Sequence, residues 1–67
     1  MRRNLIEARK AKNMTQAQLG ALVGLAKQGI CALERGQRDT NSSRWRKLAK
    51  ILESNIEHLS QDDAAVQ

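Results

Sequence analysis

The sequence predicts an all-α domain built from five short helices. Apolar residues recur at helical spacing, most clearly where Trp45, Leu48, Ala49 and Leu52 stand at positions i, i+3, i+4 and i+7. Residues that commonly cap helix N-termini precede several of these segments. Sixty-seven residues leave room for one hydrophobic core. We therefore expect a single domain in residues 1–60, followed by a polar, acidic tail in residues 61–67.

The first predicted helix covers residues 2–13. One of its faces is shared by Leu5, Ala8, Arg9 and Lys12. Three further cations, Arg2, Arg3 and Lys10, are expected to point away from that face.

The centre of the chain holds two short helical patterns joined at a glycine. In the first, Leu19 and Val23 lie four residues apart on one face; in the second, Ile30 and Leu33 lie three apart. The connection around Gly24 is too short for two helices that run side by side. Two helices that cross steeply over a tight glycine turn form a helix-turn-helix.

Two glycines and a capping pair fit this arrangement. Gly24 can adopt the positive φ that ends the second helix, and at Gly20, one turn earlier, a larger side chain could hold the two helices apart. Thr15 is a suitable N-cap for the second helix. Gln18, three residues later, can complete a capping box with Thr15.

The third helix, at about residues 26–35, has weaker local support. Ala26 offers no side-chain acceptor as a cap, and Gly29 inside the helix costs about 1 kcal/mol relative to alanine. Two unfavourable residues in one short helix suggest selection for a property other than helix stability.

A polar loop and two more helices complete the fold. Gly36 follows the third helix as a C-terminal capping glycine would, and Asn41 or Ser42 caps the fourth helix. Trp45 is expected to fill the core rather than to form a stacking platform. Ser54 and Asn55 precede a short fifth helix, whose inward residues are Ile56 and Leu59.

The positive charge is unevenly distributed along the chain. Residues 1–38 carry eight Lys or Arg against two Glu, and residues 39–52 carry four against one Asp. Residues 53–67 carry four acidic residues and no Lys or Arg. A cationic body with an acidic end fits a polyanion bound on one side, although charge alone does not distinguish nucleic acid from an anionic membrane, or either from an ordinary solvated basic face.

The residue inventory argues against enzymes and exported proteins. His58 and Cys31 fall on different predicted helices, and no His, Cys, Asp or Glu cluster has metal-ligand spacing. No cofactor or small-molecule ligand is therefore expected. A single cysteine forms no internal disulfide, and the sequence has neither a secretory signal nor an apolar run of about 20 residues. The expected protein is cytoplasmic and makes no contact with a membrane.

Several residues around the central turn share one register. They are Thr15, Gln16, Leu19, Gly20, Gly24, Leu25, Ile30, Glu34 and Gly36, with Arg9 before them and Leu48, Ala49 and Leu52 in a later helix. In this register, residues 4–59 resemble the Cro/cI-type (lambda-repressor-like, XRE) helix-turn-helix family of bacterial and phage regulators. The resemblance implies a five-helix, lambda-repressor-like, DNA-binding domain. The chain departs from the family pattern at Ala26, Thr40 and Glu53, where Ser or Thr, proline and glycine respectively are usual.

The family resemblance also implies roles for individual residues. The third helix would enter the major groove and read bases with Lys27, Gln28, Cys31 and Ala32. Phosphate contacts would come from Gln16, Arg35, Gln37, Arg38, Asn41 and Arg44. Arg9 would pair with Glu34 and tie the first helix to the third. Gly29 would allow close approach to DNA, unless it is a tolerated defect held by its neighbours Ile30 and Leu33.

The expected function is that of a transcriptional regulator, a repressor, which binds a palindromic operator as a homodimer. The fifth helix and the corner before it are the expected dimer surface. Two alternatives stay open. Leu22 and Leu25 are apolar where the family tolerates polar residues, and exposed they would suit a protein-binding module such as an antitoxin. A cationic membrane-surface peptide is disfavoured, because the basic residues are spread over several helices.

Overall fold

The computed structural model describes residues 1–61 and is all-helical over that range. Its helices are α1 (Arg3–Ala11), α2 (Gln16–Val23), α3 (Lys27–Glu34), α4 (Ser42–Ile51) and α5 (Ile56–Ser60). The predicted all-α fold of five helices is confirmed. Of the predicted acidic tail, residues 62–67 lie outside the described residues. Gln61 accepts a hydrogen bond at Oε1 from Nδ2 of Asn4 over 3.0 Å.

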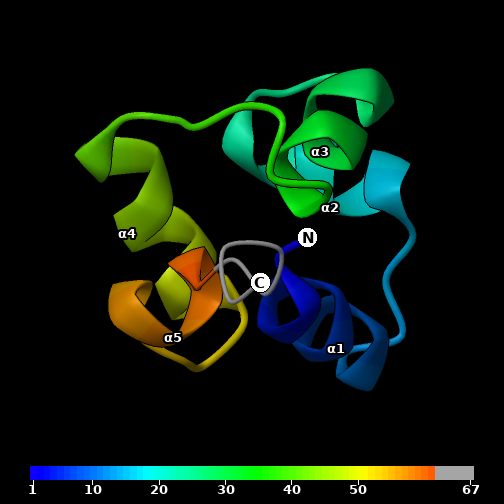
Figure 1. The fold of residues 1–67 in the computed structure, drawn as a ribbon. Helices are drawn as coiled ribbons and strands as arrows, with labels where there is room; N and C mark the ends of the chain where they lie inside the picture. The colour runs from blue at the N-terminus through cyan, green and yellow to red at the C-terminus, as the bar shows by residue number, and fades with distance from the viewer. Residues whose placement is uncertain (62–67) are drawn as a thin grey trace.

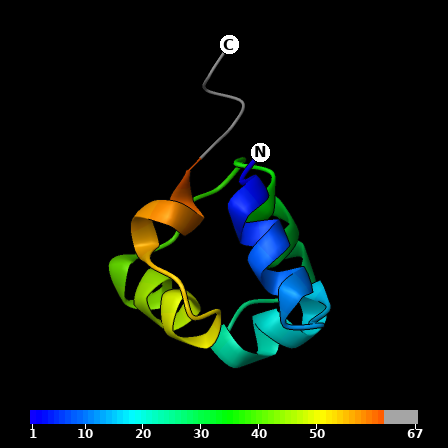
Figure 2. The ribbon, with the colours of Figure 1, turned by 90° about the horizontal axis from the view of Figure 1, so that it is seen from below.

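The helices enclose one core (Figures 1 and 2). The helix-turn-helix pair α2 and α3 occupies one side, and α3 also packs against α1. On the other side, α5 packs against α1 and α4, and α4 reaches back to α2. Among residues 1–61, this arrangement leaves one long side of α3 without a neighbouring helix (Figure 1).

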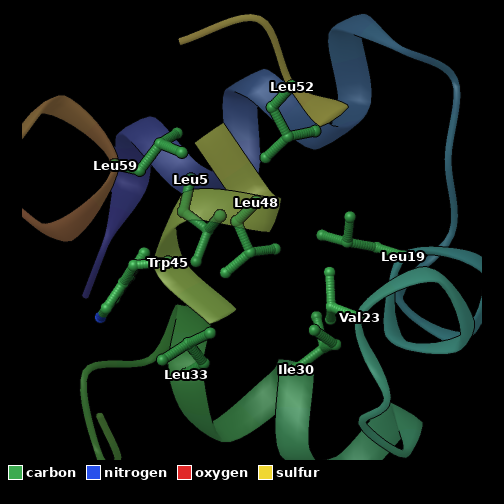
Figure 3. Packing of buried hydrophobic residues seen from close by; sticks show 9 residues of the cluster. All are labelled: Leu5, Leu19, Val23, Ile30, Leu33, Trp45, Leu48, Leu52 and Leu59. Carbon is green, nitrogen blue, oxygen red and sulfur yellow. The ribbon is translucent and has the colours of Figure 1, made fainter. Parts of the chain in front are cut away.

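The core is assembled from apolar residues of all five helices and of the segment that follows α4 (Figure 3). Its buried members are Leu5, Leu19, Val23, Ile30, Leu33, Trp45, Leu48, Leu52 and Leu59. Trp45 fills the core as predicted. The two leucines of the suggested contact patch differ, because Leu25 packs against the core whereas Leu22 is 56% exposed.

Helix capping follows the predictions closely. The Thr15 side chain accepts from the Gln18 amide, and the Gln18 side chain accepts from the Thr15 amide, so that the capping box is complete. Asn41 caps α4 and Asn55 caps α5, each through its side-chain oxygen. Ala26 provides no side-chain cap for α3.

Both glycines of the turn have the predicted roles. Gly24 ends α2 with φ of 76°, in the left-handed region. Gly20 has no side chain at the point where the backbone of Leu25, just after the turn, lies against α2. A Cβ at this position would lie 2.3 Å from the carbonyl oxygen of Leu25. The obstacle is thus the backbone of the turn itself, and the amide of Leu25 hydrogen-bonds the Gly20 carbonyl over 2.8 Å.

The corner before α5 has left-handed backbone geometry. Glu53, which stands where the family has glycine, adopts φ of 54°. Its carboxylate forms an ion pair with Lys12 just beyond α1. The pair links the end of α1 to the corner before α5 at an exposed site.

The prediction that Arg2 points away from the packed part of the domain is wrong. Arg2 is only 8% exposed, and its amide donates to the Glu34 carbonyl over 2.6 Å. The physical reason is that the helix begins at Arg3, so Arg2 has non-helical backbone angles and helical periodicity does not set its direction. The predicted bounds of residues 2–13 were too wide at both ends.

Candidate nucleic-acid interface

The outer side of α3 carries most of the predicted base-reading residues. Ile30 and Leu33 are buried, which turns the opposite side of the helix to solvent. Gln28, Ala32 and Arg35 follow one another at i, i+4 and i+7 along that opposite side; Gln28 and Arg35 are exposed and Ala32 is half-buried. Their spacing gives a continuous stripe about two turns long, on a helix of the kind that a DNA major groove admits.

The remaining two base-reading candidates flank this stripe. Lys27 is exposed in the first turn of α3, where a side chain can reach either a base or a phosphate. Cys31 is half-buried and lines a hollow of about 330 Å³ between α1 and α3, together with Arg9, Gln16 and other residues. Cys31 therefore lies on the side of α3 that faces α1, where Arg35 of the stripe lines the same hollow.

A Schellman motif ends α3 and starts the loop that follows it. Gly36 adopts φ of 77°, its amide donates to the Leu33 carbonyl over 3.2 Å, and the Gln37 amide donates to the Ala32 carbonyl over 3.0 Å. Gln37, the last residue of this motif, and Arg38, which follows it, are both exposed. The two predicted phosphate ligands are thereby held just beyond the end of α3.

Two other predicted phosphate ligands also serve within the fold. Asn41 accepts from the Arg44 amide as the cap of α4, which leaves its side-chain nitrogen to donate outward. The Arg44 side chain donates from Nε to the Val23 carbonyl over 2.8 Å and from Nη1 to the Thr40 hydroxyl over 3.0 Å. Arg44 thus stabilises the C-terminal end of α2, a role that the sequence analysis missed.

A buried polar group ties α3 to α1 and α2. Glu34 accepts at Oε2 from Nε of Arg9 over 2.6 Å and at Oε1 from Nε2 of Gln16 over 2.9 Å. Arg9 also donates from Nη1 to the Met14 carbonyl over 2.7 Å. The family resemblance implied that Arg9 pairs with Glu34 and that Gln16 binds phosphate. In the structure Gln16 also braces Glu34.

A second polar cluster, which the sequence analysis missed, lies at the far end of α3. Asp39 Oδ1 accepts from the Trp45 indole over 2.8 Å, and the Arg2 guanidinium lies over the Trp45 ring at 5.5 Å. The Trp45 hydrogen bond, then the amide of Thr40 and the charge of Arg2, lower the pKa of Asp39 below its ordinary value of 3.8. One signal was available: Asp39 is the single acidic residue in the basic stretch of residues 35–52.

Residues 1–61 were searched for groups of metal ligands and for membrane-spanning helices. Residues 1–61 contain no group of three His, Cys, Asp or Glu side chains placed to hold a metal ion. No helix in this range has the length and apolar character needed to cross a bilayer.

Comparison with known proteins identifies the fold family. The family model of helix-turn-helix proteins matches residues 5–59, from the first turns of α1 into α5, and so includes the complete pair α2 and α3. Neither a curated protein nor a solved structure matches the chain. With the matched range covering most of the chain, this protein belongs to the XRE family of Cro/cI-like, DNA-binding helix-turn-helix domains.

Proposed function

We propose that the protein is a non-enzymatic transcriptional regulator of the cytoplasm, a repressor, which reads duplex DNA with the outer side of α3. The observation that carries the proposal is the stripe of Gln28, Ala32 and Arg35, which faces away from the core on a helix whose C-terminal end is anchored by the Arg9–Glu34 pair and the Schellman motif. Gln28 can bond N6 and N7 of adenine, and Ala32 can contact a thymine methyl group. Lys27 and Cys31 flank the reading side.

Phosphate contacts supply affinity and register in this proposal. Exposed Arg35, Gln37 and Arg38 surround the C-terminal end of α3, and Gln16, Asn41 and Arg44 lie on the adjoining elements. Gln16 and Arg44 keep hydrogen bonds within the fold and would offer their remaining N–H groups to phosphate. Arg9 and Glu34 are the structural pair that orients α3.

We further propose that the protein binds a palindromic site as a homodimer. A hollow of about 460 Å³ lies on the α4 and α5 side, with Ala49 and Ile56 among its lining residues. Arg46 and Glu57, of opposite charge, also line it, so a second copy related by a two-fold axis could pair each with the other. Half-sites would then lie one helical turn, about 34 Å, apart.

Selection of bound sequences from random duplex DNA tests the proposal. A selected palindrome, with recurring bases in each half-site, is the expected result. The size of the complex on that duplex, measured by sedimentation, should correspond to two copies of the chain. Selection that enriches no sequence would overturn the regulator proposal, and one copy on the palindrome would overturn the homodimer.

A second candidate, a protein-binding module such as an antitoxin, is favoured by Leu22. This side chain is 56% exposed on α2, beside the turn rather than on the reading side of α3. Leu22→Ser tests the argument for this second candidate: DNA affinity should be unchanged, because Leu22 lies off the reading side. A loss of DNA affinity at unchanged thermal stability would place Leu22 in the DNA interface and remove the argument for the second candidate.

A further inference from the structure

Arg38 lies in a segment that has no helical hydrogen bonds of its own. Residues 37–40 connect the Schellman motif to the cap of α4 and adopt neither helix nor strand. A cation on such a segment must be ordered before it can meet a phosphate at a fixed place, and ordering costs conformational entropy. In the structure this segment is ordered by contacts with Arg2, which lies 36 positions before Arg38 in the sequence.

Arg2 holds the backbone on both sides of the Schellman motif. From Nη1 it donates to the Leu33 carbonyl in the last turn of α3 and to the Arg38 carbonyl in the loop, each over 2.6 Å. From Nε it donates to the Ser60 carbonyl at the end of α5 over 3.3 Å. One buried guanidinium therefore fixes the position of Arg38 relative to the end of α3.

Asp39, the residue after Arg38, also restrains the backbone of this loop through its side chain. Its Oδ1 accepts from Nε1 of Trp45 over 2.8 Å and from the Thr40 amide over 2.8 Å. The same oxygen lies 3.8 Å from Nη2 of Arg2. Figure 3 shows the Trp45 ring at the edge of the core, with its nitrogen turned away from the other labelled residues. The buried ring thus offers its one donor to the loop.

We propose that Arg2, Asp39 and Trp45 form a positioning cluster, which holds the backbone at Arg38 so that the Arg38 side chain meets a DNA phosphate. Asp39 is a positioning residue and acts through Arg38. The inference rests on the proposed function, because it takes Arg38 as a phosphate ligand. It assigns a DNA-binding role to an acidic side chain that would otherwise only repel DNA.

Charge alone makes the opposite prediction. The Asp39 side chain is 72% exposed and lies beside the cations expected to contact phosphate. Removal of a carboxylate at such a place should tighten binding to a polyanion. Weaker binding after removal of Asp39 therefore indicates positioning, and the sign of the change decides between the two explanations.

The experiment uses the full chain and the duplex obtained by selection. Asp39→Ala should weaken binding about tenfold, the scale expected when a loop must be ordered on binding. Asp39→Asn keeps the oxygen that accepts from Trp45 and Thr40 and should restore most of the affinity. Glu7→Ala, which removes an exposed carboxylate of α1, is the matched control and should not weaken binding. Melting curves of all variants record their stability.

A double-mutant cycle shows whether Asp39 acts through Arg38. In an Arg38→Ala background, Asp39→Ala should change the affinity by less than about twofold, while its effect on thermal stability should be the same as in the wild type. Trp45→Phe keeps the packing of the ring and removes the donor, so it should weaken binding in the same direction. This variant tests the cluster even if Asp39→Ala unfolds.

Three outcomes are decisive. Equal or tighter binding by Asp39→Ala, with Trp45→Phe also unchanged, overturns the positioning cluster but leaves the proposed function intact. The same loss in both backgrounds shows that Asp39 does not act through Arg38 and likewise overturns it. A wild-type chain that binds no duplex overturns the proposed function itself, and the inference with it.

Discussion

Nε of Arg9 in α1 donates to Oε2 of Glu34 in α3 over 2.6 Å, at a site where the Glu34 residue is only 3% exposed. The other carboxylate oxygen accepts from Gln16 at the start of α2. Three helices therefore meet at one buried charge, which fixes the orientation of α3 relative to the rest of the domain. A buried ion pair of this kind adds little net stability as a pair, but loss of one partner leaves an uncompensated charge.

We expect Arg9→Ala to lower the free energy of unfolding by about 3–5 kcal/mol, because Glu34 is left buried without its cation. Lys10→Ala, which removes an exposed cation from the same helix, should cost less than about 1 kcal/mol. Urea unfolding followed by circular dichroism measures both. Equal midpoints for the two variants would contradict a structural role for the pair.

We expect Gln28→Ala and Arg38→Ala to affect DNA binding in different ways. Loss of the Gln28 base contacts should cost about 1–3 kcal/mol of binding free energy on the preferred site. Because Gln28 is uncharged, binding to scrambled duplex should stay nearly unchanged. Arg38→Ala should weaken binding to all sequences and make the salt dependence shallower by about one unit per subunit. Competition titrations at several salt concentrations measure both effects. An equal loss on both duplexes for Gln28→Ala would remove Gln28 from the reading side.

We expect Gly29→Ala to raise stability by about 0.5–1 kcal/mol, because alanine is the better helix former. The structure has room for it: a Cβ at this position would lie 3.4 Å from Cδ2 of Leu25, an ordinary packing distance. Thermal melting measures the gain.

The same variant decides between the two interpretations of Gly29. Since the added methyl group would face Leu25 rather than solvent, DNA affinity should stay unchanged. A stable Gly29→Ala variant that loses DNA affinity would show that this glycine admits close approach of DNA.

We expect the contribution of Asp39 to stability to depend on pH in one direction. Its pKa is lower in the folded chain than the ordinary 3.8, chiefly because the Trp45 indole donates to the carboxylate. The stability that the ionised carboxylate contributes is therefore fully present above that ordinary value, and it is lost as the pH falls through the lower folded pKa. Free energies of unfolding of the wild type and Asp39→Asn should differ at neutral pH and converge in acid. A difference that does not change with pH would mean that the charge of Asp39 makes no contribution.

The sequence by itself determined the elements whose causes are local. Thr15 and Gln18 lie three residues apart, so their capping box could be predicted from the chain alone, as could the left-handed turn at Gly24. The core was also determined, because apolar residues recur at helical spacing and so select one side of each helix. Leu19 in α2, Ile30 in α3 and Leu48 in α4 each belong to such a pattern, and all three are buried. The pairing of Arg9 with Glu34 came from the family register rather than from periodicity.

Only the tertiary structure decided where the remaining polar side chains go. Arg2 reaches carbonyls 31 and 36 residues along the chain, and Arg44 reaches the end of α2, 21 residues before it. Periodicity indicates which side of a helix is buried, but it carries no information about which distant backbone carbonyl can accept a further hydrogen bond. A long cationic side chain can satisfy such a carbonyl in the fold or a phosphate outside it. The choice depends on distances that exist only once all five helices have packed together.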